Sequence, residues 1–279
     1  MPQFDRAGED VGNIVALEHV NVRVPDQVRA TDFYVTALGL TRDPYLVTGT
    51  NNMWINVGQS QFHLPVGEPQ CLRGQTGLVM PDLDALEARL DAAEVPSERG
   101  NGHIDTACPW GNRIRIHGPR SGRTLAMDYV AFDVPEGAAE AAAAFYREVW
   151  RTPAWVDGDG VAHASVGRGQ ELRFIETAEA QPDYDGHHIA IYVADFSGPH
   201  RWLDERGLVS EESNQWQYRF LDIVDPGTAE PVFRIEHEVR SMTHPIYGRP
   251  LVNRNPAVTN NAFVPGHEAV AWRAPPEPC

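Results

Sequence analysis

The sequence predicts an α+β fold made of four copies of one strand–helix–strands unit. Residues 18–26 read EHVNVRVPD and residues 128–136 read DYVAFDVPE, so two alternating strands each end in a proline and an acid. Each is followed by a helix pattern with a Phe-Tyr pair, and related segments occupy residues 75–95 and 188–208. Repeated patterns indicate repeated backbone geometry, so equivalent positions can be compared for chemistry.

The first two units are expected to form an N-terminal domain over residues 13–119. Alternation, turn residues and an amphipathic leucine spacing predict its elements. These are a strand at His19–Val24, a helix over about 28–40, strands at Met53–Val57 and Gln61–Val66, a helix at Leu83–Ala93 and a closing strand at Arg113–His117. Gly58-Gln59-Ser60 is expected to form a turn.

The last two units are expected to form a C-terminal domain over residues 127–239, after a linker at 120–126. Phe233–His237 is its predicted closing strand. Residues 240–279 are rich in Pro, Asn and Gly and are expected to form an extended tail.

Composition excludes several classes of function. A net charge of −16 would repel a phosphate backbone, so nucleic acid is not expected as a partner. No apolar run reaches about 18 residues, so no membrane partner is expected either. The polar N-terminus is unlike a secretory signal, and three widely spaced cysteines indicate free thiols in a reducing compartment, so a cytoplasmic location is expected. Neither the oligomeric state nor the substrate follows from the sequence, and a homo-oligomer stays open.

Four such units in two pairs resemble the vicinal oxygen chelate superfamily, also called the glyoxalase/bleomycin-resistance/dioxygenase group. The resemblance covers about residues 16–239 and is carried by HVNVRV with DFYVTALGL, WGNRIRI, DYVAFDV with AAFYREV, and HHIAIYV with FRIEHE. The layout is most similar to the two-domain type I extradiol dioxygenases. The resemblance implies that each domain forms an incomplete β-barrel around a cavity, with metal ligands on the first and last strands of its units.

In the extradiol enzymes, the second domain holds Fe(II) through two His and one Glu. Carried over, these positions fall on His188 and Glu236, which have the expected residue types. The other histidine position is Tyr129, and a neutral phenol is a poor ligand. Arg173 stands near the position of a catalytic histidine and, being always protonated, could bind an anionic substrate or pair with Glu236. Tyr218 lies where related enzymes place a hydrogen-bonding tyrosine.

The first domain offers a second set at the equivalent positions. These are His19, His63, Gln75 and Arg115, whose guanidinium would oppose a cation. His163 could replace the ligand missing at Tyr129.

The resemblance therefore implies an extradiol-dioxygenase-like enzyme that acts on a small aromatic or oxygen-rich substrate. The expected cofactor is a divalent metal, Fe(II) first, with Mn(II) or Zn(II) as alternatives; no organic cofactor is expected. Two other functions stay open: a metal-dependent isomerase, epimerase or lyase on the same scaffold, and a metal-free binding protein for a small molecule.

Overall fold

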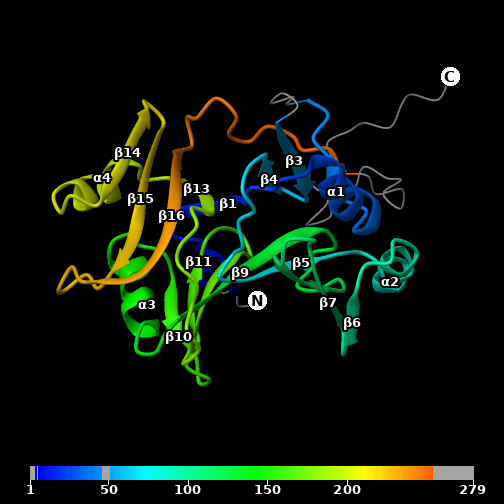
Figure 1. Cartoon of the computed structure of the whole chain (residues 1–279). Coiled ribbons are helices and arrows are strands. Elements are labelled where there is room, and N and C mark those ends of the chain that lie inside the picture. Colours follow the sequence, from blue (N-terminus) through cyan, green and yellow to red (C-terminus); the bar gives the residue numbers. More distant parts are fainter. Residues whose placement is uncertain (1–3, 5, 46–50, 254–279) are drawn as a thin grey trace. The chain divides into compact units, whose positions relative to one another are not determined.

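Two eight-stranded sheets and a few short helices make up the computed structural model of the chain (Figure 1). The structure describes residue 4 and residues 6–45 and 51–253. Each sheet has two edge strands, so neither closes into a barrel within these ranges. The predicted α+β class is confirmed. None of the helices in the described ranges has the length and hydrophobicity needed to cross a bilayer.

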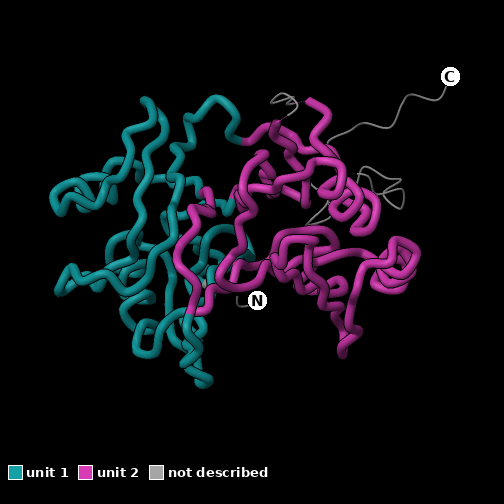
Figure 2. The backbone as a smooth tube through the Cα atoms, in the orientation of Figure 1, with its two compact units in different colours: residues 1–17, 134–180, 191–247 teal, residues 18–133, 181–190, 248–279 magenta. Residues whose placement is uncertain are grey.

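The chain divides into two compact units, and each unit draws on both halves of the sequence (Figure 2). Unit 1 comprises residues 1–17, 134–180 and 191–247, and unit 2 comprises residues 18–133, 181–190 and 248–279. The predicted domain boundaries follow the repeats along the sequence instead, and they stay a prediction.

Unit 2 holds the elements of the first two repeats together with most of the first strand of the third repeat. They are β1 (Ile14–Asn21, from Glu18 onward), α1 (Gln27–Thr31), η2 (Asp32–Ala37), β2 (Thr41–Arg42), β3 (Asn52–Val57), β4 (Ser60–Pro65), β5 (Gly74–Val79), α2 (Leu83–Ala92), β6 (Ser97–Gly100), β7 (His103–Ala107), β8 (Arg113–His117) and most of β9 (Ala126–Pro135). One sheet contributes the run β1-β4-β3-β2, and the other contributes β9-β5-β8-β7-β6.

The β3–β4 hairpin matches its prediction, including the turn that begins at Gly58. Gly58 has a φ of +65°, and a Cβ there would lie 2.4 Å from the carbonyl oxygen of Leu125, so only glycine fits. The hairpin pairs Trp54 with His63, and the parallel β1–β4 pairing sets Asn21 opposite His63. These registers bring the polar residues of β1, β3 and β4 into one neighbourhood.

The acids that end the first strands of the first two repeats begin the helices that follow. Asp26 accepts hydrogen bonds from the backbone N–H groups of Val28 (2.8 Å) and Arg29 (3.0 Å), and Asp82 caps α2 in the same way. The helix predicted over 28–40 is α-helical only to Thr31 and continues as the π-helical turn η2. Periodicity of 3.6 residues does not reveal such a widened turn.

Unit 1 holds most elements of the last two repeats. They are η1 (Ala7–Glu9), α3 (Ala139–Glu148), β10 (Ala154–Val156), β11 (Ala162–Ser165), β12 (Glu171–Thr177), the later part of β13 (His188–Val193), α4 (Ser197–Asp204), β14 (Val209–Asn214), β15 (Gln217–Val224) and β16 (Pro231–Ser241). Its sheet runs are β14-β15-β16 and β10-β11-β12. Phe145, Tyr146, Trp150 and Phe220 are fully buried and form its aromatic core.

A short segment after β16 returns to unit 2, and we call residues 248–253 the C-terminal strap. The side chain of Asn253 accepts from the N–H of Gly58 (3.0 Å) and donates to its carbonyl oxygen (2.8 Å). Asn56 donates to the carbonyl oxygen of Val252 at 3.0 Å. Residues 254–279 of the predicted tail lie outside the described residues.

Candidate metal centre

Three of the predicted histidines lie together in unit 2. The rings of His19 on β1 and His63 on β4 stack with centroids 3.6 Å apart, and the ring of His188 lies edge-on to His19 at 5.4 Å. His19 and His63 are 1% and 4% exposed. The sequence suggested His188 for one domain and His19 with His63 for another, whereas the structure gathers all three in one compact unit.

The ring of His63 is held between two flat neighbours. Trp54 stacks against it at 3.9 Å with an interplanar angle of 7°, and His19 stacks against it with an angle of 23°. Such packing restricts the rotamer of His63 before any ligand binds. Its Nε2 lies 3.1 Å from Oε1 of Gln61.

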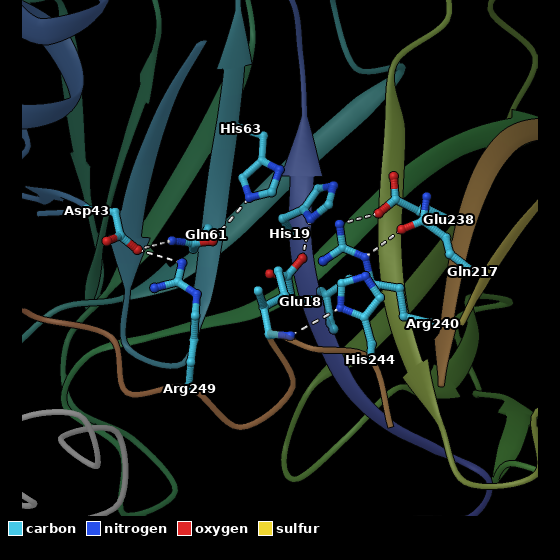
Figure 3. A network of polar contacts seen from close by, with 12 residues as sticks. Glu18, His19, Asp43, Gln61, His63, Gln217, Glu238, Arg240, His244 and Arg249 are labelled. Carbon is cyan, nitrogen blue, oxygen red and sulfur yellow. Dashed lines mark hydrogen bonds and ion pairs between the residues drawn. The ribbon is translucent and has the colours of Figure 1, made fainter. Parts of the chain in front are cut away.

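A carboxylate completes this group. Glu18 makes a short contact to Nδ1 of His19 (Figure 3). One ligand atom from each of Glu18, His19 and His63 lies within 4.8 Å of the others. A carboxylate bound to one ring nitrogen fixes the tautomer of a metal-binding histidine and directs the other nitrogen outward.

The donor set fits a divalent transition metal. Imidazole nitrogens bind Zn, Fe and Ni well, and carboxylate oxygens complete such sites. Buried imidazoles that share one neighbourhood also supply nitrogen donors without placing net positive charge there, provided that they are neutral. The group Glu18, His19 and His63, with His188 beside it, is therefore a credible ligand set on chemical grounds.

Two carboxylates of β16 lie in unit 1 and differ in burial. The side chain of Glu236 is 21% exposed and that of Glu238 is 4% exposed. Arg219 pairs with both, and Arg240 pairs with Glu238 as well. Two guanidinium groups offset the desolvation of Glu238.

Tyr129, predicted near the site, lies on β9 in unit 2. It is 4% exposed, and its hydroxyl is 3.4 Å from Nε2 of His117. Burial, together with Arg120, lowers the pKa of His117 to about 4, so this imidazole is neutral at pH 7. A Cβ at Gly77 would lie 2.1 Å from the ring of Tyr129, so the ring lies across the glycine. Its hydroxyl thus has a histidine neighbour of its own.

His163 and Arg173 face each other in register on β11 and β12 of unit 1. Nε2 of His163 is 2.9 Å from Asp157, its Nδ1 is 3.4 Å from Glu171, and its ring stacks on the exposed Trp155. Arg173 donates to Glu171 at 2.9 and 3.0 Å. These contacts supply His163 with carboxylate partners at both nitrogens.

Tyr218 lies on β15 and is 1% exposed. Its ring packs against Phe196 at 5.1 Å and His200 at 4.8 Å. Burial raises the pKa of its hydroxyl, so the phenol stays protonated at neutral pH. It can serve as a hydrogen-bonding group but not as a base.

The sequence comparison of the repeats did not identify Glu18, Gln61 or Trp54 as neighbours of the histidines. Gln61 and His63 stand two apart on one strand, and that spacing places both on the same face, so the pattern QFH contained a usable signal. Trp54 becomes a neighbour of His63 only through the hairpin register.

Comparison with known proteins supports the fold. No family model matches the sequence, and no curated protein matches it. A Bacillus subtilis protein named as a candidate dioxygenase superposes with a TM-score of 0.59 at 15% identity, over 86% of this chain and 92% of that one. Glyoxalase I from Zea mays gives a TM-score of 0.59 at 13% identity, over 81% of this chain and 92% of that one.

These likenesses and the repeated units define the class of fold. The chain has a two-domain glyoxalase-like fold, which is the fold that its sequence resemblance implied. At this level of identity the comparison shows the fold alone, and chemistry has to be argued from the side chains.

Proposed function

We propose that the chain is a metal-dependent enzyme that acts on a small substrate with two adjacent oxygens. The observation that carries this proposal is the buried group of His19 and His63 with the Glu18 carboxylate, all within 4.8 Å. His188 lies beside His19 and extends the set. We propose His19, His63 and His188 as the nitrogen ligands.

The carboxylate of Glu18 lies with His19 and His63 in unit 2, and we propose that it belongs to the same centre. Glu236 on β16, the ligand that the repeat pattern implies, stays a prediction.

When bound, a divalent metal polarises adjacent substrate oxygens and stabilises the negative charge that develops on them. The chain's own residues prepare for this chemistry. Glu18 holds the proton of His19 on Nδ1, which leaves the lone pair of that ring on Nε2. Stacking on Trp54 fixes the plane of the His63 ring. The rings of His19 and His63 are both buried, which keeps water away from their nitrogen donors.

We propose oxidative ring cleavage as the reaction, with Fe(II) as the metal or Mn(II) in its place. Zn(II) has no redox chemistry, so it would suit only the isomerase or lyase reaction. The donor types support this choice, because imidazoles and carboxylates are the ligands of non-haem iron sites that activate oxygen. The likeness to the Bacillus subtilis candidate dioxygenase supports the same reaction class.

Metal analysis of protein purified anaerobically tests the proposal. We expect one equivalent of metal per chain, lost in His19→Ala and retained in His200→Ala, a histidine on α4 that contacts Glu212. Oxygen uptake with a panel of catechols then tests the reaction. A metal-free protein that binds an aromatic ligand tightly would establish the binding-protein alternative, and metal retained in His19→Ala would refute the ligand assignment.

Isomerase or lyase chemistry is a second candidate, supported by the likeness to glyoxalase I. It needs no oxygen, so the two candidates separate in one experiment. Substrate turnover under argon, followed by solvent deuterium incorporation, would favour the isomerase; turnover that requires oxygen would favour the dioxygenase.

A further inference from the structure

The His63 imidazole ends a chain of polar side chains that begins at the half-buried Arg249 of the C-terminal strap (Figure 3). Arg249 of the strap lies 2.5 Å from Oδ2 of Asp43. Nε2 of Gln61 donates to the same oxygen at 2.9 Å, and Oε1 of Gln61 is 3.1 Å from Nε2 of His63. Gln61 is 0% exposed and Asp43 is 4% exposed, and all four residues belong to unit 2.

The neighbours of Gln61 fix the direction of its amide. Besides Asp43, its Nε2 donates to Oδ1 of Asn56 at 2.6 Å. Asn56 uses its own Nδ2 to donate to the carbonyl oxygen of Val252, so Oδ1 is an acceptor. Both groups that face Nε2 of Gln61 are therefore acceptors. The oxygen Oε1 must face His63.

This direction determines the tautomer of His63. An amide oxygen only accepts, so Nε2 of His63 carries the proton and donates to Gln61. The lone pair of the neutral ring then lies on Nδ1. Stacking on Trp54 fixes the plane of the ring, and the bond to Gln61 fixes its rotation within that plane.

We propose that Gln61, Asp43 and Arg249 are positioning residues that hold His63 in the tautomer whose Nδ1 binds the metal. This inference rests on the proposed function. Arg249 pairs with the same buried Asp43 oxygen that accepts from Gln61, so removing the Arg249 charge disturbs the group that holds the Gln61 amide. The C-terminal strap therefore supports the metal centre as well as the fold.

The tautomer is tested directly on the metal-free, full-length protein. Histidine labelled with ¹⁵N gives distinct long-range couplings for the two tautomers, and His63→Ala assigns the signal. We expect the proton on Nε2, and on addition of Zn(II) we expect the Nδ1 resonance to shift while Nε2 keeps its proton. A proton on Nδ1 in the metal-free protein overturns the proposal.

Affinity for Co(II) tests the positioning role. Gln61→Leu should weaken binding about 10- to 100-fold and alter the visible absorption bands of bound Co(II). Arg249→Gln should act in the same direction. The matched control is Asn112→Leu, which removes a buried amide that bonds Leu72 and Gln70 elsewhere in unit 2 at 2.8 Å. The control should lose stability but keep the Co(II) affinity and spectrum.

The outcomes separate this inference from the proposed function. If His63→Ala abolishes Co(II) binding while Gln61→Leu behaves like Asn112→Leu, the positioning role is refuted and the metal site stands. If the wild-type protein does not bind Co(II), both are refuted. If His63→Ala binds Co(II) unchanged, His63 is not a ligand, so this inference is refuted while the metal-dependent function stands.

Discussion

Replacing His237 by Gln should remove a large part of the acid sensitivity of unit 1. His237 lies on β16, is 0% exposed and stacks on Phe220 at 4.3 Å. Its Nδ1 donates to the carbonyl oxygen of Ile235 at 2.9 Å, and the hydroxyl of Tyr146 donates to its Nε2 at 2.6 Å. Burial lowers the pKa of His237 from 6.5 to about 4.

The sign of the effect follows from that direction. Between pH 6.5 and 4 the unfolded chain binds a proton at His237 that the folded protein does not, so stability falls as the pH falls. At 1.36 kcal/mol per pKa unit, the loss is about 2 kcal/mol at pH 5 and about 3 kcal/mol below pH 4. Above pH 7 it vanishes.

Urea unfolding with a chelator present, followed by circular dichroism and tryptophan fluorescence, measures this loss. Between pH 7 and pH 5 the wild-type protein should lose about 2 kcal/mol more than His237→Gln, which keeps an acceptor for Tyr146 but does not titrate. Tyr146→Phe is the control: it leaves the buried Nε2 without its donor at a cost of about 1–3 kcal/mol, yet it keeps the pH slope. Equal slopes for wild type and His237→Gln would refute the reasoning.

Three further outcomes are expected. Glu18→Gln should lower Co(II) affinity about 10-fold or more in a chelator competition, because His19 loses the carboxylate that contacts its Nδ1; an unchanged affinity would count against that role. Gly77→Ala should displace the ring of Tyr129 and cost about 1–3 kcal/mol in urea unfolding. Asp82→Ala should cost about 1 kcal/mol in the same assay, because α2 loses its N-cap.

The repeats predicted most strands, because alternation reports on sheets that bury one face. The closing strand Arg113–His117 has the predicted bounds. The first strand does not: it runs over Ile14–Asn21, whereas His19–Val24 was expected. Val22 and Val24 still donate to the carbonyl oxygens of His63 and Pro65, but between them the N–H of Arg23 donates to the side chain of Gln70 at 2.9 Å, which interrupts the regular ladder. Nothing in the local sequence indicates a partner 47 residues away.

The candidate site was predictable in its residue types but not in its grouping. Repeat comparison selects His19, His63 and His188, because it aligns first and last strands. It does not determine which strands lie side by side, since that depends on sheet order. Glu18 and Gln61 were missed for a related reason: carboxylates and amides on strands serve many purposes, and their roles here depend on the imidazole that each contacts.

The equivalent positions of the second repeat have a different chemistry within the same unit. Where the first repeat has His19 and His63, the second has Gln75 and Arg115, and Arg115 makes a bidentate pair with Asp105 at 2.7 Å. That pair neutralises its own charge and leaves no acidic donor for a cation. A guanidinium in place of an imidazole also repels a metal ion. The first repeat therefore offers metal donors, whereas in the second repeat Arg115 is paired with Asp105. We therefore expect the chain to bind one metal ion, not two.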